Sequence, residues 1–317
     1  MSLQLQMQAH RDALRAILGA PPDRAPLNPR ILETADMETY RREKITYQLS
    51  PNEWGFAYLL IPHNITTPAP VVFCHHRHNR DWRIGKSEIV GLAGNSSGSI
   101  GLELVERGYI VFAPDAISFE DRAPKNINFD DPLEPYIHNF SELAVRLLRG
   151  ETLLKKVIWD VSRGIDYLLT RQETDPNYIA IIGHGYGGKM AMWAMAFDER
   201  IIAGVAHGGI GSMHAALRQG LPIQVEFAVP RLLQIADYDR ILSLAAPRPF
   251  LLSASRNDPE SSDGELVYQK AKRTYQRMGA ENRFSLYYYD PEPDEPLFPA
   301  HARHQAYSWL DNWLKPF

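Results

Sequence analysis

The sequence predicts an α/β fold: a mostly parallel sheet of eight strands with helices on both faces and a small cap-like insertion. From about residue 44 to the C-terminus, short apolar runs alternate with longer stretches of helical periodicity. Parallel strands need crossover helices between them, so this alternation favours a covered parallel sheet. A second indication is a buried strand that runs directly into a glycine-rich turn and a helix, at residues 179–196.

The expected strands are apolar runs of strand length, at 44–49, 55–61, 70–75, 108–113, 178–183, 201–206, 248–253 and 283–289. A short connection at 51–54 joins the first two runs, so we expect an antiparallel hairpin at one edge of the sheet. The later runs are separated by helical stretches, which predicts that they pair in parallel.

Helical periodicity recurs between and after these runs, at 98–107, 141–171, 187–197, 265–278 and 301–314. The segment 208–245 contains Pro222 and Pro230 and lies where such sheets often carry an inserted cap. We therefore expect a single α/β domain over residues 44–317, with 208–245 as a candidate cap.

Residues 1–43 precede this domain and differ from it in pattern. Apolar positions at 9–18 have helical spacing, and a proline-rich arm follows, with prolines at 21, 22, 26 and 29. We expect a short amphipathic helix and an arm that wraps the domain. Such an arm could also serve as a homodimer contact.

Composition excludes several classes of function. An apolar fraction of 44% and a charged fraction of 23% are those of an ordinary soluble globular protein. The net charge of −4 and the lack of a basic run argue against a nucleic-acid partner. The N-terminus does not resemble a signal peptide and no run reaches membrane-span length, so we expect a cytoplasmic protein without a membrane partner. The single cysteine, Cys74, lies in an apolar run and predicts a buried thiol.

The most informative motif is the strand–turn–helix at residues 179–196, which reads IAIIGHGYGG followed by KMAMWAMA. This is the setting of the G-x-S-x-G nucleophile elbow, where a serine stands on a sharp turn between strand and helix. Gly185 occupies the place of that serine, and glycine has no side chain that could attack a carbonyl. Any chemistry here must therefore proceed without an elbow serine.

Several further motifs follow one another in a recognisable order: GKSE at 85–88, GLAGN at 91–95, ERGYIVFAPDA at 106–116, GHGYGG at 183–188, DERI at 198–201, APRPFLL at 246–252 and AYSWLDNWL at 306–314. In this order the chain resembles the dienelactone hydrolase-like and acetyl xylan esterase-like branch of the α/β-hydrolase superfamily, from about residue 44 to the C-terminus. The resemblance implies an α/β-hydrolase fold. Function must still be argued from the site.

The resemblance also implies where a catalytic triad would lie. Asp258 follows the strand at 248–253 and could orient a base, although an aspartate before Pro259 also suits a plain turn. The family's histidine position falls at Pro296. His301 would reach the pocket only if the register were shifted; otherwise it is a surface histidine of the last helix.

Other parts of the site are expected to persist without the serine. The turn at 75–80 and the backbone N–H of Tyr186 would form an oxyanion hole, with His76 and His78 as candidate bases besides Asp258 and His301. Along an extended turn, neighbouring histidines point to different faces. No carboxylate has a matching spacing, so we expect neither a metal nor a cofactor.

A charged cluster at 118–122 follows the fourth expected strand, at the sheet edge where ligands bind in parallel sheets. We expect an ion pair of Glu120 with Arg122 or Arg77 that shapes the pocket. The alternative is that one of these arginines recognises a substrate carboxylate.

Three functions fit this sequence. The first is an enzyme that uses the pocket for acid–base elimination, isomerisation or cyclisation of a small carbonyl or ester substrate. The second is a carboxylic ester hydrolase whose nucleophile was removed or replaced by water. The third is a non-catalytic homologue that binds a ligand or a partner, which a pocket plugged by 208–245 or by the acidic loop 290–299 would favour.

Overall fold

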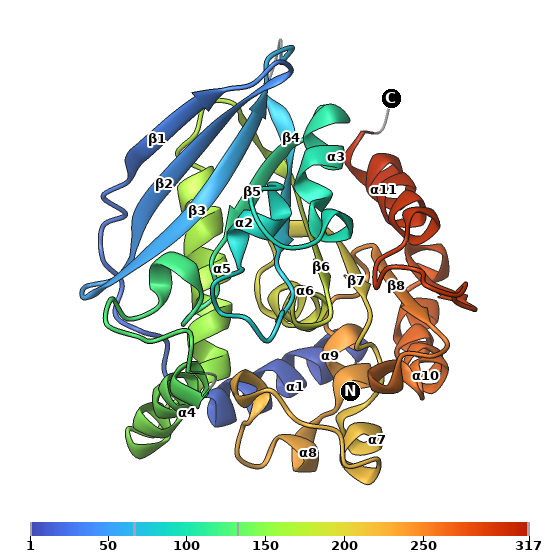
Figure 1. Ribbon diagram of the computed structural model, residues 1–317. Helices are drawn as coiled ribbons and strands as arrows, with labels where there is room; N and C mark the ends of the chain where they lie inside the picture. The colour runs from blue at the N-terminus through green and yellow to red at the C-terminus, as the bar shows by residue number, and fades with distance from the viewer. Residues whose placement is uncertain (1, 66–67, 132, 316–317) are drawn as a thin grey trace.

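Nine strands form one sheet through the middle of the molecule, in a computed structural model that describes residues 2–65, 68–131 and 133–315 (Figure 1). They are β1 (Arg30–Asp36), β2 (Tyr40–Ser50), β3 (Glu53–Pro62), β4 (Ala69–His75), β5 (Ile110–Pro114), β6 (Thr174–His184), β7 (Ile201–His207), β8 (Phe250–Ser255) and β9 (Phe284–Tyr289). Their order across the sheet is β1-β2-β3-β5-β4-β6-β7-β8-β9. The strands β5, β4, β6, β7, β8 and β9 pair in parallel, whereas β1, β2, β3 and β5 pair antiparallel. The predicted α/β class and the antiparallel hairpin, β2–β3, are confirmed, but β1 and not the hairpin forms the edge of the sheet.

The sheet has one strand more than the eight predicted. The additional strand, β1, is formed by residues expected to belong to the proline-rich arm, and it pairs with β2 at the sheet edge. Its side chains are almost all exposed, including Ile31 and Leu32. An edge strand without a buried face shows no apolar alternation, so the sequence pattern did not reveal it.

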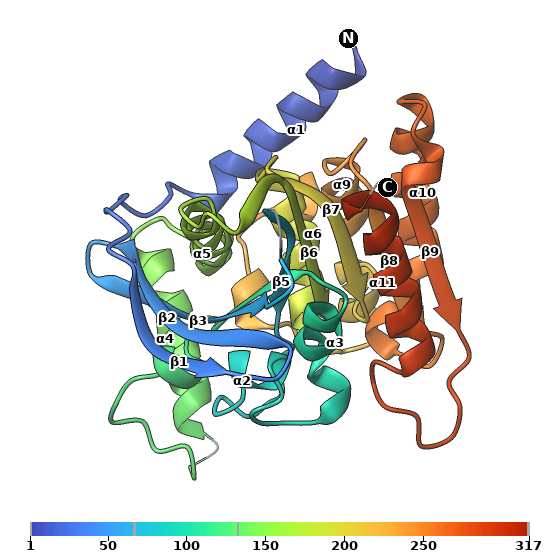
Figure 2. The ribbon, with the colours of Figure 1, turned by 90° about the horizontal axis from the view of Figure 1, so that it is seen from above.

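The helices are α1 (Leu3–Leu18), α2 (Lys86–Ile89), α3 (Ile100–Glu106), α4 (Leu133–Leu148), α5 (Leu153–Leu168), α6 (Tyr186–Phe197), α7 (Met213–Arg218), α8 (Leu232–Ile235), α9 (Tyr238–Ser243), α10 (Gly264–Arg277) and α11 (Ala300–Leu314). Figure 2 shows α3 and α11 on one face of the parallel strands and α5 and α6 on the other. Alternate residues of one strand reach the two cores: Val71 and Phe73 face α5 and α6, while Val72 and Cys74 face α3 and α11.

The helical stretch expected at 141–171 is divided between two helices, α4 and α5, and the first of them begins earlier, at Leu133. Gly150 has a φ of +73° between them, a conformation that glycine adopts without steric cost. Thr152 then caps α5 by accepting a hydrogen bond from the Lys155 amide. Because this turn is short, the apolar periodicity continues almost unbroken from α4 to α5, and the sequence pattern did not reveal the break.

The candidate cap, residues 208–245, contains α7, α8 and α9. Helix α9 packs on α6 and α10, and α8 packs on α1, so the segment extends the helical layer on that face of the sheet. Of this segment, Gly208, Gly209 and Gln224 line the main cavity described below. No helix among the described residues is long and apolar enough to cross a membrane.

Candidate functional site

The turn between β6 and α6 is reduced to one residue, Gly185, with φ +55° and ψ −111°. Tight packing surrounds this elbow. A Cβ on Gly187 would lie 2.1 Å from the His75 carbonyl oxygen, and one on Gly183 would lie 2.2 Å from the Gly187 carbonyl carbon. Both positions therefore require glycine, because any side chain would collide with backbone.

Gly185 differs from its glycine neighbours because a Cβ there would meet no described atom within 4 Å. The position of the elbow side chain thus opens into free space. Its own amide donates a hydrogen bond to the His207 carbonyl (2.7 Å). The next residue, Tyr186, begins α6, whose first amides have no intrahelical partner and carry the positive end of the helix dipole.

A cavity of about 650 Å³ lies at this elbow, where the parallel strands end. Its walls come from segments far apart in the sequence, namely 77–80, 184–186, 207–209, 257–260 and 295–297, with Gln224, Ser255, Tyr289 and Pro291. Such a crevice at the carboxyl ends of strands is the usual ligand site of α/β sheets. The segments 208–245 and 290–299 line this cavity and leave it open.

Asp258 lies in the cavity wall after β8, where the sequence placed it. Its Oδ2 accepts hydrogen bonds from the Gly209 amide (2.8 Å) and the Ser261 hydroxyl (2.5 Å), and its Oδ1 accepts one from the Glu260 amide (3.1 Å). It caps the short 3-10 turn that begins at Pro259. The carboxylate therefore holds two loops of the cavity together and keeps little free acceptor capacity.

The loop before α11 brings a carboxylate to the cavity. Pro296 lines the wall, as does its neighbour Glu295, whereas His301 is not among the lining residues. Instead, the His301 ring contacts Glu295 through Nε2 (2.9 Å) and the Tyr287 hydroxyl through Nδ1 (3.1 Å). His301 thus reaches the cavity only indirectly, by orienting Glu295.

The two predicted histidine bases have different surroundings. His76 is fully buried and lies outside the cavity lining; its Nδ1 donates to the Arg77 carbonyl (2.8 Å) and its Nε2 accepts from the Ala116 amide (3.0 Å). His78 lines the cavity, and its Nδ1 accepts a hydrogen bond from the Arg80 amide (3.2 Å). Burial lowers the pKa of His78 to about 4, so its imidazole is neutral at physiological pH.

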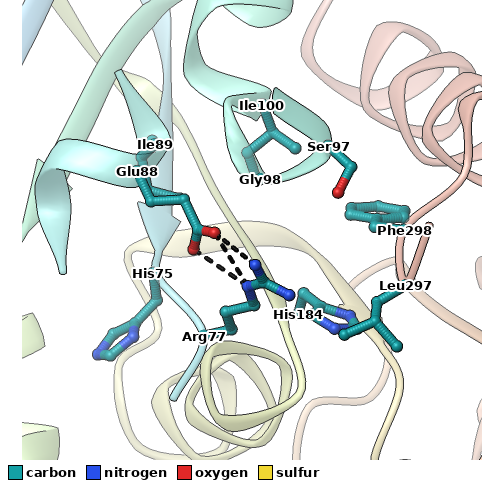
Figure 3. Close-up of a pocket in the computed structure, with 10 residues that line it drawn as sticks. All are labelled: His75, Arg77, Glu88, Ile89, Ser97, Gly98, Ile100, His184, Leu297 and Phe298. Atoms are coloured by element: carbon teal, nitrogen blue, oxygen red, sulfur yellow. Dashed lines mark hydrogen bonds and ion pairs between the residues drawn. The ribbon is translucent and has the colours of Figure 1, made fainter. Parts of the chain in front are cut away.

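Arg77 is held rigidly at the cavity. Its Nε and Nη2 donate to Glu88 (3.0 and 2.7 Å to Oε1), whose side chain is 1% exposed and also accepts from the Asn79 amide group. Figure 3 shows the guanidinium between Glu88 and His184, with Leu297 beyond. A recess of about 10 Å³ lies here and shares Arg77, His184 and Leu297 with the main cavity. A bidentate pair of this kind fixes both the charge and the plane of the arginine.

The expected ion pair of Glu120 with Arg122 or Arg77 is wrong. Glu120 binds the ammonium of Lys86 (2.7 Å) and lies outside the cavity lining. Arg122 binds Asp160 (2.8 Å) and is also outside this cavity. The sequence placed these charges after β5 correctly but could not identify their partners.

Lys86 lies at the centre of three carboxylates. Its Nζ is 2.7 Å from Asp115, 2.7 Å from Glu120 and 2.6 Å from Asp121. Burial raises the pKa of Asp115 to about 7 against the opposing effect of Lys86. Burial alone would lower the pKa of Lys86, but the charges of Asp115 and Glu120 raise it above its ordinary value. Among the described residues these carboxylates are the one group spaced to hold a metal, and the lysine ammonium already occupies their centre.

The residues of the cavity wall that the sequence analysis did not single out include Glu295 and His184. His184 precedes Gly185 and stacks near His207 and Phe298, with ring centroids 5.1 and 6.0 Å away. Its Nδ1 is buried and forms no hydrogen bond with the residues that the structure describes. Burial lowers its pKa to about 4, so the ring is neutral at pH 7. Its place inside the elbow motif was the signal that could have marked it.

The fold and the elbow at the end of β6 define the α/β-hydrolase class. The chain belongs to the Abhydrolase family, whose sequence model matches residues 4–205. The model of the prolyl oligopeptidase family also matches, over residues 150–315. Both matches include the elbow.

Known proteins similar to this chain are named as hydrolases and esterases. One, named "Putative hydrolase YtaP", from Bacillus subtilis (strain 168), is 29% identical over 309 residues, which cover 96% of this chain and 98% of that protein. A structure named "putative acetyl xylan esterase", from Bacteroides fragilis, has a TM-score of 0.76 at 19% identity and covers 92% of this chain and 77% of its own. A glucuronoyl esterase from Solibacter usitatus has a TM-score of 0.64 at 15% identity, with coverages of 93% and 88%. At these identities the two structures establish the fold alone.

Proposed function

We propose that this protein is an enzyme of the α/β-hydrolase family that works without a nucleophilic side chain at the elbow. In this proposal it performs acid–base chemistry, such as elimination, isomerisation or cyclisation, on a small carbonyl or ester substrate. The observation that carries the proposal is the cavity itself: a side-chain-free elbow at Gly185 and the carboxylate of Glu295 line the same space of about 650 Å³.

The elbow would bind the substrate carbonyl oxygen. The amide of Tyr186, at the N-terminus of α6, and an amide of the turn at 75–80 would act as donors. Backbone donors do not depend on the residue at 185, and the helix dipole favours negative charge at this point. Charge that develops on the oxygen, as in an enolate, would therefore be stabilised.

Glu295 would move the proton. Its Oε1 contacts His301 and its Oε2 accepts a hydrogen bond from the Glu292 amide (3.2 Å), so the carboxylate is held at the cavity wall. Asp258 is less suited to this role, because its oxygens already accept three hydrogen bonds. His301 is then a positioning residue that acts through Glu295.

The test is exchange of α-protons for deuterium, followed by ¹H NMR in D₂O on a panel of short ketones, keto acids and lactones. We expect exchange well above the buffer rate for at least one compound, and a loss of about 10²–10⁴-fold in Glu295→Gln. Glu292→Gln, an exposed glutamate of the same loop, is the matched control and should retain the rate. Exchange at the buffer rate throughout the panel, or an unchanged rate in Glu295→Gln, would refute the proposal.

Ester hydrolysis by an activated water is the second candidate, favoured by the free space at Gly185 and by the hydrolase names of similar proteins. To distinguish ester hydrolysis from acid–base chemistry, the hydrolysis of short aryl esters is measured for the wild-type protein and for the Gly185→Ser variant. Acid–base chemistry predicts little turnover in either protein, because Pro296 stands in the cavity wall at the position of the family's histidine. A large gain in Gly185→Ser would instead indicate an ester hydrolase that lacks only its nucleophile.

A further inference from the structure

Helix α4 has an exposed apolar face in addition to its buried one. Its buried residues Pro135, Asn139 and Leu143 face the body of the protein, where α4 packs on α5 and the turn at 225–227. Its exposed large apolar residues are Leu133 (63% exposed), Tyr136 (48%), Ile137 (61%), Phe140 (59%), Val145 (44%), Leu147 (40%) and Leu148 (88%). Leaving Val145 aside, each of them lies three, four, seven or eleven residues from another, and so they form one stripe along the helix, which we call the α4 stripe. Figure 1 shows α4 at the outer margin of the molecule.

The α4 stripe is large for a surface that faces water. With areas typical of such side chains, the exposed fractions leave roughly 700 Å² of apolar surface, whereas the largest patch on a monomer is usually about 300–600 Å². A stable interface buries about 800 Å² on each partner. The stripe with its polar margins approaches that area, so it suits a permanent protein partner.

The charges beside the stripe match a second copy of the same helix. The N-terminal end of α4 is acidic, with Asp131 before it and Glu134 in its first turn, while the exposed Arg149 directly follows its C-terminal end. If two copies of α4 lie antiparallel and cross near Phe140, Leu133 of each faces Leu147 of the other. The same arrangement places Arg149 of each copy opposite Asp131 of its partner and within one helical turn of Glu134.

We infer that this protein forms a two-fold symmetric homodimer in which two copies of α4 pack antiparallel through the α4 stripe. A two-fold axis requires a patch that is complementary to itself, and the stripe meets this condition in both its apolar residues and its end charges. This interface lies outside the N-terminal arm, which the sequence suggested as a dimer contact. It does not depend on the proposed reaction.

Sedimentation velocity over a range of protein concentrations tests the interface. We expect wild type to sediment at twice the chain mass of 36.0 kDa. Phe140→Glu and Ile137→Glu should be monomers with unchanged circular dichroism, since both side chains face away from the core. Leu266→Glu, at a leucine of α10 that is 52% exposed, is the matched control and should remain dimeric.

A charge exchange tests the antiparallel register. Arg149→Glu should weaken the dimer by placing like charges together, and the double variant Glu134→Arg/Arg149→Glu should restore it. A wild-type protein that stays monomeric at every concentration would overturn the inference, including the case in which it binds phosphatidylcholine vesicles through α4. A Phe140→Glu protein that remains dimeric would overturn it as well.

Discussion

Two polar clusters at the carboxyl edge of the sheet differ in whether their polar groups are paired within the protein. Around Lys86, one ammonium is surrounded by Asp115, Glu120 and Asp121, and the lysine side chain is 1% exposed. Around Gly185, by contrast, polar groups line an open cavity, and the Nδ1 of His184 has no hydrogen-bond partner in the described part of the chain.

This difference distinguishes charged side chains that stabilise the fold from polar side chains that are available to bind a ligand. Buried charges whose hydrogen bonds are satisfied within the protein have no capacity left for a substrate. Groups that face a cavity with free donors or acceptors remain available. Both clusters follow strands in the sequence as short polar runs, so only their partners distinguish them.

The largest expected effect on stability comes from removing the ammonium group at the centre of the Lys86 cluster. Lys86→Met should lower the free energy of unfolding by about 3–5 kcal/mol, because Asp115 and Glu120 would remain buried without their cation. Lys189→Met, which removes a pair with Glu260 at the cavity wall, should cost about 1 kcal/mol or less. Urea denaturation at pH 7 measures both variants. Equal losses of unfolding free energy in the two variants would contradict the proposed difference between the Lys86 cluster and the cavity wall.

A smaller effect is expected at Asp258, which belongs to the cavity but has its hydrogen bonds satisfied internally. Asp258→Asn should lower the free energy of unfolding by about 1.5–3 kcal/mol, because one amide nitrogen would face donors that now bind a carboxylate oxygen. Asp290→Asn, at an exposed aspartate after β9, is the control in the same urea titration. A neutral result for Asp258→Asn would show that the two loops do not depend on this carboxylate.

The smallest effect concerns His184 and depends on pH. Its pKa is about 4 in the folded protein and about 6.5 in the unfolded chain, so the unfolded chain binds more protons between these values. The stability contributed by the neutral ring is complete above pH 6.5 and is lost as the pH falls toward 4. Between pH 7 and 5.5 it amounts to about 1 kcal/mol. His184→Phe should therefore lose less stability than wild type over this range; parallel pH profiles would contradict the assignment.

Local patterns in the sequence were sufficient to predict the strands with a buried face and the elbow. The apolar runs predicted every strand from β2 to β9, because each of these strands has at least one buried face. The strand β1 lacked such a face and was missed. The glycines at 183 and 187 marked the elbow because the close approach of backbones there tolerates no side chain.

By itself, then, the sequence determined the α/β-hydrolase fold and the absence of a side chain at Gly185. Only the tertiary structure decided that Glu120 binds Lys86, that Glu295 rather than His301 lines the cavity, and that the stripe on α4 remains uncovered by the described chain. The physical reason is the separation along the chain between the residues that interact. Strands, helices and tight turns depend on residues a few positions apart, whereas ion pairs and cavity walls join side chains that meet only after folding.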